Sequence, residues 1–356
     1  MYIFIIVFIA LLILAILDQF VNTNIFIYIS MLILVILAGF RNIAATINND
    51  TSMYYGIYNG YIDRKLEGGY VFLENIFHLL NANWTCFAIF IALLTLGIVT
   101  KEFSVFTDVP GYALLYYYAR FFVSRDMNQI RASLATAILF LAVKYVYDNK
   151  LLNFLLVIFI AWTIHHGALV GILIYPLYEW LKNIKKQKYL GIFTTTIVIA
   201  IGLSFKMNTF FVKISDFFTS VYITNPSFNQ GGGLLNPVLW LQILISFIAV
   251  YSYDQNKYKK TKYYSVILVM YVLSTVLLAL FNQYYTLAGR ISTILTTGEP
   301  IIIINLLESW VKGPKKYIYF VIFTIIIFYL INNNLVNSDL INIYSLFLYK
   351  AILDGV

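Results

Sequence analysis

Long apolar runs alternate with short polar segments along almost the whole chain. A helix that crosses a membrane needs about 20 mostly apolar residues, with a range of about 17–25. Runs that approach this length lie at residues 2–17, 24–40, 85–100, 109–123, 130–147, 151–165, 167–182, 188–205, 236–253, 263–281, 290–311 and 317–332. These runs are continuous and do not alternate with polar residues, which argues against a closed β-barrel. The pattern predicts an all-α polytopic membrane protein with about 12 transmembrane helices.

Two of these segments need a further decision. The first reads MYIFIIVFIALLILAIL and has neither a basic start nor a small-residue cleavage site. It is therefore interpreted as a first span and not as a removed signal peptide. The segment 109–123 is short, so it fits either a full span or a re-entrant helix. No repeat and no soluble domain stand out, and residues 1–356 are expected to form a single transmembrane domain.

Composition supports the membrane class and removes several others. The chain is 61% hydrophobic and 11% charged, whereas soluble domains are about 45–50% apolar and about 25% charged. The single cysteine, Cys86, excludes an internal disulfide framework and a cysteine-rich metal site. The net charge of +8 does not indicate nucleic-acid binding, because the lysines gather in short loops between apolar runs.

The basic residues predict an orientation. Lysines cluster in the loops 182–188, 254–262 and 312–316, which all fall on one side of the membrane; the positive-inside rule makes that side cytoplasmic. The two longer loops, about 41–84 and 206–236, then lie outside. All of the arginines fall outside or at the outer membrane edge: Arg41, Arg64, Arg120, Arg125, Arg131 and Arg290. Because the guanidinium group binds phosphate and carboxylate through two parallel contacts, this sorting predicts an outward-facing anion site.

The loop 41–84 holds three candidate site residues. Arg41 ends the second span and either extends to the interface or contacts a phosphate. Asp50 stands one helical turn before Tyr54, and it is expected either to orient Arg41 or to act as a base. Glu67 precedes two glycines in a turn that brings backbone close to a ligand or simply reverses the chain.

The remaining helix of this loop and the next span carry further signals. Residues 70–80 have apolar positions at helical spacing and are expected to lie on the membrane surface. Arg131 opens the segment IRASLATAIL, whose small residues allow neighbouring helices to approach closely. A charged side chain at the start of such a helix is a functional candidate. Arg120 belongs to the same cluster of arginines, and Arg125 is expected to pair with Asp126.

Two further candidates are titratable groups later in the chain. His165 and His166 are adjacent, so on a helix they point about 100° apart and form a poor metal site. Each histidine therefore either hydrogen-bonds backbone or headgroups or carries a proton. Glu299 lies in a late apolar segment nine residues after Arg290, and it either contributes a functional carboxylate or forms a buried structural contact. Pro300 predicts a broken helix there.

The outer loop 206–236 contains glycines, asparagines and nearby aromatic residues. This composition fits either contacts to sugars or a simple hinge. No spacing in the chain suits a metal ion, because the third histidine, His78, is remote and Cys86 stands alone. The expectation is a protein without metal or other cofactor, active in the presence of EDTA.

Together these motifs resemble the EpsG-like branch of the Wzy-type O-antigen and capsule polymerases. The marks that carry the resemblance are GFR ending at Arg41, then Asp50 with a Tyr-rich loop; Glu67-Gly68-Gly69-Tyr70; Ile130-Arg131 with Ser133-Leu134-Ala135; His165 before Gly167-Ala168-Leu169; and Arg290. They cover about residues 39–300. The doubled histidine departs from the family pattern, and its place before x-small-Ala-Leu favours His165.

The resemblance implies a GT-C-like helical bundle and a polymerase of lipid-linked repeat units, such as those of lipopolysaccharide. Such enzymes work at the periplasmic face of the bacterial inner membrane without metal. They transfer a growing glycan from undecaprenyl diphosphate to a new lipid-linked repeat unit, with a chain-length regulator as partner. Arg41, Arg131 and Arg290 would neutralise the diphosphate, with Glu67, Arg120 and His166 as further substrate contacts. Asp50, His165 or Glu299 would deprotonate the acceptor hydroxyl.

Two other functions use similar substrates. A flippase for lipid-linked oligosaccharide needs a cationic cavity, but it is expected to carry charges toward both faces and an internal repeat. An O-antigen ligase shares the carrier chemistry and has a large periplasmic loop. The one-sided set of arginines favours the polymerase.

Overall fold

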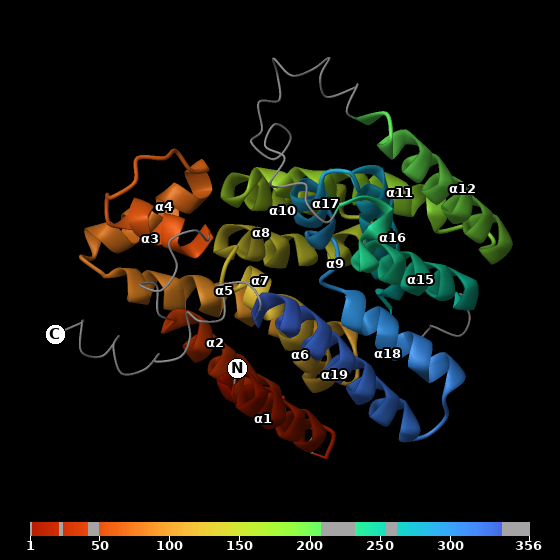
Figure 1. The fold of residues 1–356 in the computed structure, drawn as a ribbon, viewed down its shortest axis with the longest axis horizontal. Coiled ribbons are helices and arrows are strands. Elements are labelled where there is room, and N and C mark those ends of the chain that lie inside the picture. The colour runs from red at the N-terminus through yellow and green to blue at the C-terminus, as the bar shows by residue number, and fades with distance from the viewer. Residues whose placement is uncertain (1, 21–23, 42–49, 208–231, 254–261, 337–356) are drawn as a thin grey trace. The chain divides into compact units, whose positions relative to one another are not determined.

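Helices are the regular elements throughout the residues that the computed structural model describes, which are 2–20, 24–41, 50–207, 232–253 and 262–336 (Figure 1). Contacts divide the chain into two compact units. The first holds the residues up to 141, residues 156–168 and those from 311 onward. The second holds residues 142–155 and 169–310.

The first unit carries the N-terminal helices and the last one. Its elements are α1 (Tyr2–Asp18), α2 (Ile25–Gly39), α3 (Asp50–Tyr58), α4 (Gly68–Leu79), α5 (Trp84–Phe106), α6 (Pro110–Tyr117), the π-helix η1 (Tyr118–Phe122), α7 (Val123–Arg125), α8 (Ile130–Phe140), the later part of α10 (Leu151–Ile164) and α19 (Lys315–Val336). The polar loop expected at 41–84 thus contains two helices, α3 and α4.

Close backbone approach holds this unit together. A Cβ atom on Gly111 of α6 would lie 2.9 Å from the Cα of Ala15 in α1, so the two helices meet where small residues face each other. The Tyr118 hydroxyl donates to the carbonyl of Phe4 over 2.8 Å. Phe328 of α19 packs on Phe8 with ring centroids 4.9 Å apart. Figure 1 shows α1, α6 and α19 running beside one another.

The segment expected at 109–123 is helical from Pro110 to Arg125, with one π-helical turn inside it. A helix of this length rises about 24 Å, which is less than the roughly 30 Å of membrane hydrocarbon. Nearly all residues of this segment are buried. The small residues of α8 are buried as well, and α5 packs against that helix.

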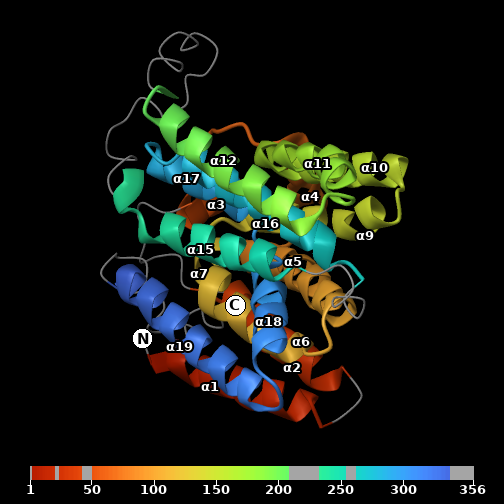
Figure 2. The ribbon, with the colours of Figure 1, turned by 90° about the vertical axis from the view of Figure 1, so that its right-hand side faces the viewer.

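The second unit is built on α16. Its elements are α9 (Ala142–Tyr147), the start of α10, most of the 3-10 helix η2 (His166–Leu173), α11 (Ile174–Leu181), α12 (Lys186–Ser204), the short η4 (Gly233–Leu235), α15 (Pro237–Ser252), α16 (Tyr264–Leu280), α17 (Tyr285–Thr293) and α18 (Glu299–Trp310). α12, α15 and α16 contact one another, and Figure 2 shows them stacked. The segment expected as one span at 167–182 is 3-10 helix in its first half.

The segment expected as one span at 290–311 is two helices. α17 ends at Thr293 and α18 begins at Glu299, with turns between them. Pro300 has no N–H group, and the hydroxyls of Thr293 and Thr296 bond to backbone carbonyls three residues earlier. These local bonds replace the helical ladder at the break. The break that Pro300 predicted is therefore present.

Three helices in the described ranges are long and apolar enough to cross a membrane: Trp84–Phe106, Ile130–Tyr147, which joins α8 and α9, and Lys186–Ser204. Several others are apolar but shorter, among them α2, α15 and α16. These helices are those of a membrane protein. The count of about 12 spans stays a prediction.

Candidate functional site

The side chain of Glu67 is the centre of a polar cluster in the first unit. Glu67 precedes α4 in extended conformation, with φ −66° and ψ 141°. Its carbonyl accepts the backbone N–H groups of Tyr70 and Val71, each over 3.0 Å. Its carboxylate does not bond to the N–H groups of its own helix. The backbone thus starts the helix, and the carboxylate is left to bind residues from other elements.

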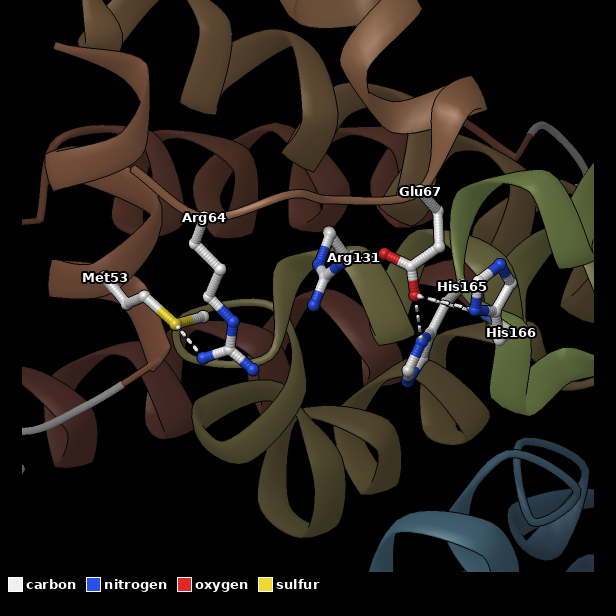
Figure 3. A network of polar contacts seen from close by, with 6 residues as sticks. All are labelled: Met53, Arg64, Glu67, Arg131, His165 and His166. Carbon is white, nitrogen blue, oxygen red and sulfur yellow. Dashed lines mark hydrogen bonds and ion pairs between the residues drawn. The ribbon is translucent and has the colours of Figure 1, made fainter. Parts of the chain in front are cut away.

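Those residues come from two distant segments. The carboxylate accepts from Arg131 Nη1 through one oxygen. Through the other it meets His165 Nδ1 at 3.2 Å and the backbone N–H of His166 at 3.3 Å (Figure 3). The side chain of Glu67 is only 10% exposed and that of Arg131 only 11%. Two candidate side chains, Arg131 and His165, and one backbone amide therefore converge on the nearly buried carboxylate of a third candidate, Glu67.

Arg131 is held by aromatic rings as well as by Glu67. Its Cζ lies 5.1 Å from the ring centre of Tyr54 and 5.9 Å from that of Tyr70, and both rings are buried. Contacts of this kind stabilise a cation more strongly where water is excluded. Arg131 Nε is buried and has no hydrogen-bond partner among the described residues. The guanidinium group is thus fixed in place with donor capacity left over.

The turn before α8 sets the position of Arg131. Asp126 accepts from the Tyr117 hydroxyl at 2.9 Å and from the Ser133 hydroxyl at 3.0 Å. Burial raises the pKa of Asp126 to about 6, against the lowering effect of these bonds and of Arg125. The hydroxyl of Thr51, at the start of α3, donates to the Met127 carbonyl in the same turn over 2.7 Å. The entry to α8 is therefore tied to α3.

The carboxylate determines the tautomer of His165. An ionised carboxylate only accepts hydrogen bonds, so the Nδ1 atom facing it carries the proton. In the neutral ring Nε2 is then the acceptor nitrogen. His165 is 21% exposed and follows the end of α10, where its N–H bonds to the Ala161 carbonyl. His166 is 66% exposed, and its ring packs on Trp162 with centroids 5.3 Å apart.

A glycine brings the start of α4 against the end of α10. A Cβ atom on Gly69 would lie 2.5 Å from Thr163 Oγ1 and 2.9 Å from the Thr163 carbonyl oxygen. A Cβ atom on Gly68 would meet nothing within 4 Å. Of the two glycines, Gly69 therefore allows the close approach that puts Glu67 beside His165.

The other candidates of this unit lie around the cluster. The backbone N–H of Asp50 donates to Asn128 Oδ1 over 3.1 Å at the start of α3. Arg41 is buried, donates from Nη1 to the Ala38 carbonyl, and has its Cζ 5.9 Å from the ring centre of Trp84. Arg120 lies in the π-helix with its Cζ 5.4 Å from the ring centre of Phe121. These contacts of Asp50, Arg41 and Arg120 are with groups other than the Glu67 carboxylate.

Arg290 and Glu299 lie in the second unit. Arg290 is in the last turn of α17, and Glu299 opens α18 with its side chain fully buried. The Glu299 N–H bonds to the Thr296 carbonyl over 2.9 Å. The neighbouring Ser292 carbonyl accepts the Ser274 hydroxyl of α16 over 2.8 Å. Both candidates therefore flank the break between α17 and α18.

Comparison with known protein families identifies the family of this chain. The profile of the EpsG family matches residues 24–350, which is nearly the whole chain. The chain belongs to the EpsG family. Family membership and apolar helices together make it a membrane protein with a role in polysaccharide synthesis. Neither curated proteins nor solved structures gave a match.

Two residues near the cluster of this EpsG protein were not found from its sequence. Glu74 lies one turn after Tyr70 on the inner face of α4, buried, and its Oε1 has no hydrogen-bond partner within the described ranges. Burial raises the pKa of Glu74 to about 7. Burial also raises the pKa of Tyr70 well above its usual range; Glu74 adds to this and Arg41 opposes it. The spacing of four between Tyr70 and Glu74 was the available signal.

Arg64 is the second. The sequence pattern assigned Arg64 no role beyond its place among the outer arginines, whereas in the structure its Nη1 donates to the thioether of Met53 on α3 over 2.9 Å (Figure 3). A pairing with a methionine eleven residues away has no signature in the sequence.

Several predictions lie outside the described residues or concern metals. Of the loop 206–236, the structure describes only the ends, and the start of the loop 41–84 is likewise outside it. Within the described ranges, His, Cys, Asp and Glu form no group of three that could hold a metal ion. His78 stacks on Tyr58, with ring centroids 4.3 Å apart.

Proposed function

We propose that this protein is a polysaccharide repeat-unit polymerase of the O-antigen type. It would transfer the growing glycan from undecaprenyl diphosphate to a new lipid-linked repeat unit, at the periplasmic face of the bacterial inner membrane. One observation carries the proposal: the nearly buried Glu67 carboxylate holds an arginine and a histidine together. Transfer from a diphosphate carrier needs a cation for the leaving group and a base for the acceptor.

The histidine is the base in this proposal. Glu67 orients the ring through Nδ1, so Nε2 accepts the proton of the acceptor hydroxyl. The acceptor oxygen forms a bond to the anomeric carbon of the donor glycan. The bond from that carbon to the diphosphate oxygen breaks, and the diphosphate leaves with the electron pair. Glu67 stabilises the imidazolium that results, and the proton later returns to solvent.

The arginines supply the electrostatic part. Charge builds up on the leaving diphosphate, and a fixed guanidinium group in a site with little water stabilises it strongly. Arg131 occupies such a position, and Arg41, Arg120 and Arg290 are proposed as further contacts to the lipid-linked substrate. Asp50 and Glu299 remain the alternative bases. The proposed protein partner is a chain-length regulator, and the lipid partner is the surrounding membrane.

The test uses purified protein and a lipid-linked repeat unit as sole substrate. A ladder of glycans on the carrier lipid is expected. Transport into vesicles without covalent change would instead identify a flippase. Transfer to lipid A core, with no ladder from the repeat unit alone, would identify a ligase. Either result would overturn the polymerase.

A further inference from the structure

Arg64 has unused hydrogen-bonding capacity beside the candidate site. It lies in the extended segment between α3 and α4 and is exposed. In the part of the chain that the structure describes, Arg64 donates one hydrogen bond, to the Met53 thioether, which is a weak acceptor. Guanidinium carries five N–H donors. Most of the donor capacity of Arg64 is therefore available to a ligand.

Arg64 and Arg131 contact neighbouring residues of α3. Met53 bonds to Arg64, and the adjacent residue Tyr54 has its ring 5.1 Å from Arg131 Cζ. Both arginines thus rest on the same turn of α3. Arg64 is also three residues from Glu67 in extended chain, which separates their Cα atoms by at most about 10 Å. In Figure 3 the side chain of Arg131, which comes from α8, lies between those of Arg64 and Glu67.

The charges of this group do not cancel. Glu67 neutralises one guanidinium group through its contact with Arg131. Arg64 adds a second positive charge. Arg131 Nε is a buried donor without a partner in the described chain. An anion that accepts from both arginines would satisfy that donor and balance the excess charge.

We propose that Arg64 and Arg131 form a two-arginine subsite for a diphosphate. This inference rests on the proposed function and names a ligand of the leaving group that lies outside the family marks. A diphosphate offers oxygens on two phosphorus atoms, so it can accept from two guanidinium groups at once. A carboxylate of an acidic sugar could supply similar oxygens, but it offers only one acceptor group and one charge.

The experiment measures binding of inorganic pyrophosphate to the purified full-length protein by calorimetry. Arg64→Gln is expected to weaken the affinity by about tenfold or more, as loss of a charge-assisted contact predicts. The control is Lys65→Gln, which removes a neighbouring exposed cation and is expected to leave the affinity within about twofold. Because Arg64 is exposed, the melting temperature of Arg64→Gln should match that of the wild type.

The outcomes separate this subsite from the proposed function. Equal pyrophosphate affinity for Arg64→Gln and wild type, or no binding to wild type, would overturn the subsite. An Arg64-dependent affinity for glucuronate but not for pyrophosphate would assign Arg64 to an acidic sugar and also overturn it. Glycan ladders together with Arg64-independent binding would leave the polymerase intact. Arg64-dependent binding without any ladder would leave the subsite and remove the polymerase.

Discussion

The Glu67 carboxylate accepts hydrogen bonds from three donors. Substitutions of Glu67 and Arg131 are therefore expected to affect protein stability as well as activity. The two carboxylate oxygens contact Arg131, His165 and the His166 backbone. Removing either member of a nearly buried ion pair leaves an uncompensated charge, which costs about 3–5 kcal/mol. Alanine at position 67 or 131 would therefore lower protein level as well as activity. Conservative substitutions separate the two effects.

The first prediction concerns Arg131→Lys. Lysine keeps the charge beside Glu67, so the melting temperature should stay close to that of the wild type. It lacks the fork that binds phosphate oxygens in pairs, and turnover should fall about tenfold or more. The measurement is the rate of ladder formation at matched protein amounts. Wild-type ladders from both Arg131→Lys and Arg290→Lys would remove the arginines from the reaction.

The second prediction uses the two adjacent glycines. Gly69→Ala should separate α4 from Thr163, because the added methyl group meets backbone and side-chain atoms of that residue. Ladder formation should fall at least about tenfold, since a displacement of about 1 Å in a catalytic group is costly. Gly68→Ala is the matched control, because its methyl group meets open space. Equal loss in both variants would show that helix propensity, not this contact, is responsible.

Single residues were largely predictable, whereas their pairing was not. Glu67, Arg131, His165 and His166 were each chosen from residue type and position in the membrane pattern. Their meeting depends on long-range contacts: Glu67 and Arg131 are separated by 64 residues in the sequence, and Glu67 and His165 by 98. No local pattern encodes such contacts. Arg64 and Glu74 were missed because the first depends on a thioether contact and the second on burial.

At the scale of the element, α4 carries a residue of the site at its start and an apolar outer face. Its outer face exposes Phe72, Leu79 and Leu80, while Tyr70 and Glu74 face inward. This is the amphipathic pattern expected of a helix that lies on the membrane surface. Glu67 stands at its N-terminal end. The sequence predicted the helix to within two residues, because its apolar positions have helical spacing.

The third prediction concerns the buried carboxyl of α4. The pKa of Glu74 is about 7 in the folded protein and 4.5 ordinarily, so the folded state holds this proton more tightly. The stability that this group contributes is complete below about pH 4.5 and is lost as the pH rises through about 7. Glu74→Gln should therefore lose less of its melting temperature between pH 5 and pH 8 than the wild type.

The control for Glu74 is an exposed carboxylate. Asp63→Asn, in the loop before α4, should leave the pH dependence of the wild type unchanged. Parallel melting curves for wild type and Glu74→Gln across this pH range would contradict the assignment.

For the whole molecule, the apolar pattern predicted an all-helical membrane protein, and the structure agrees in the described ranges. The predicted number of about 12 spans stays a prediction. The run at 290–311 breaks between Thr293 and Glu299, and about half of the run at 167–182 is 3-10 helix. Hydrophobicity records burial in lipid or in protein alike, so it cannot separate a span from a buried shorter helix.

The fourth prediction concerns orientation. Single cysteines at positions 50–80 should react with a membrane-impermeant maleimide from outside, and those at 183–188 only after the membrane is opened. The background must be Cys86→Ser, because Cys86 is exposed and would itself react. Labelling of position 60 only from the cytoplasmic side would reverse the orientation and move the Glu67 cluster to the wrong face.

The fifth prediction concerns metals. Ladder formation should be unchanged by EDTA, because the proposed base and the proposed diphosphate ligands are all side chains. Loss of ladders that a divalent ion restores would require a metal in the reaction.

The contact between Glu67 and the His166 amide has a consequence for comparing relatives. The cluster uses position 166 as a peptide N–H, while the side chain there is 66% exposed. Many residue types could occupy this position without changing the hydrogen bond, and proline alone would abolish it by removing the hydrogen. In an alignment of homologues, position 166 should therefore vary freely beside an invariant position 165. A column that seems unimportant would still contain an atom of the site.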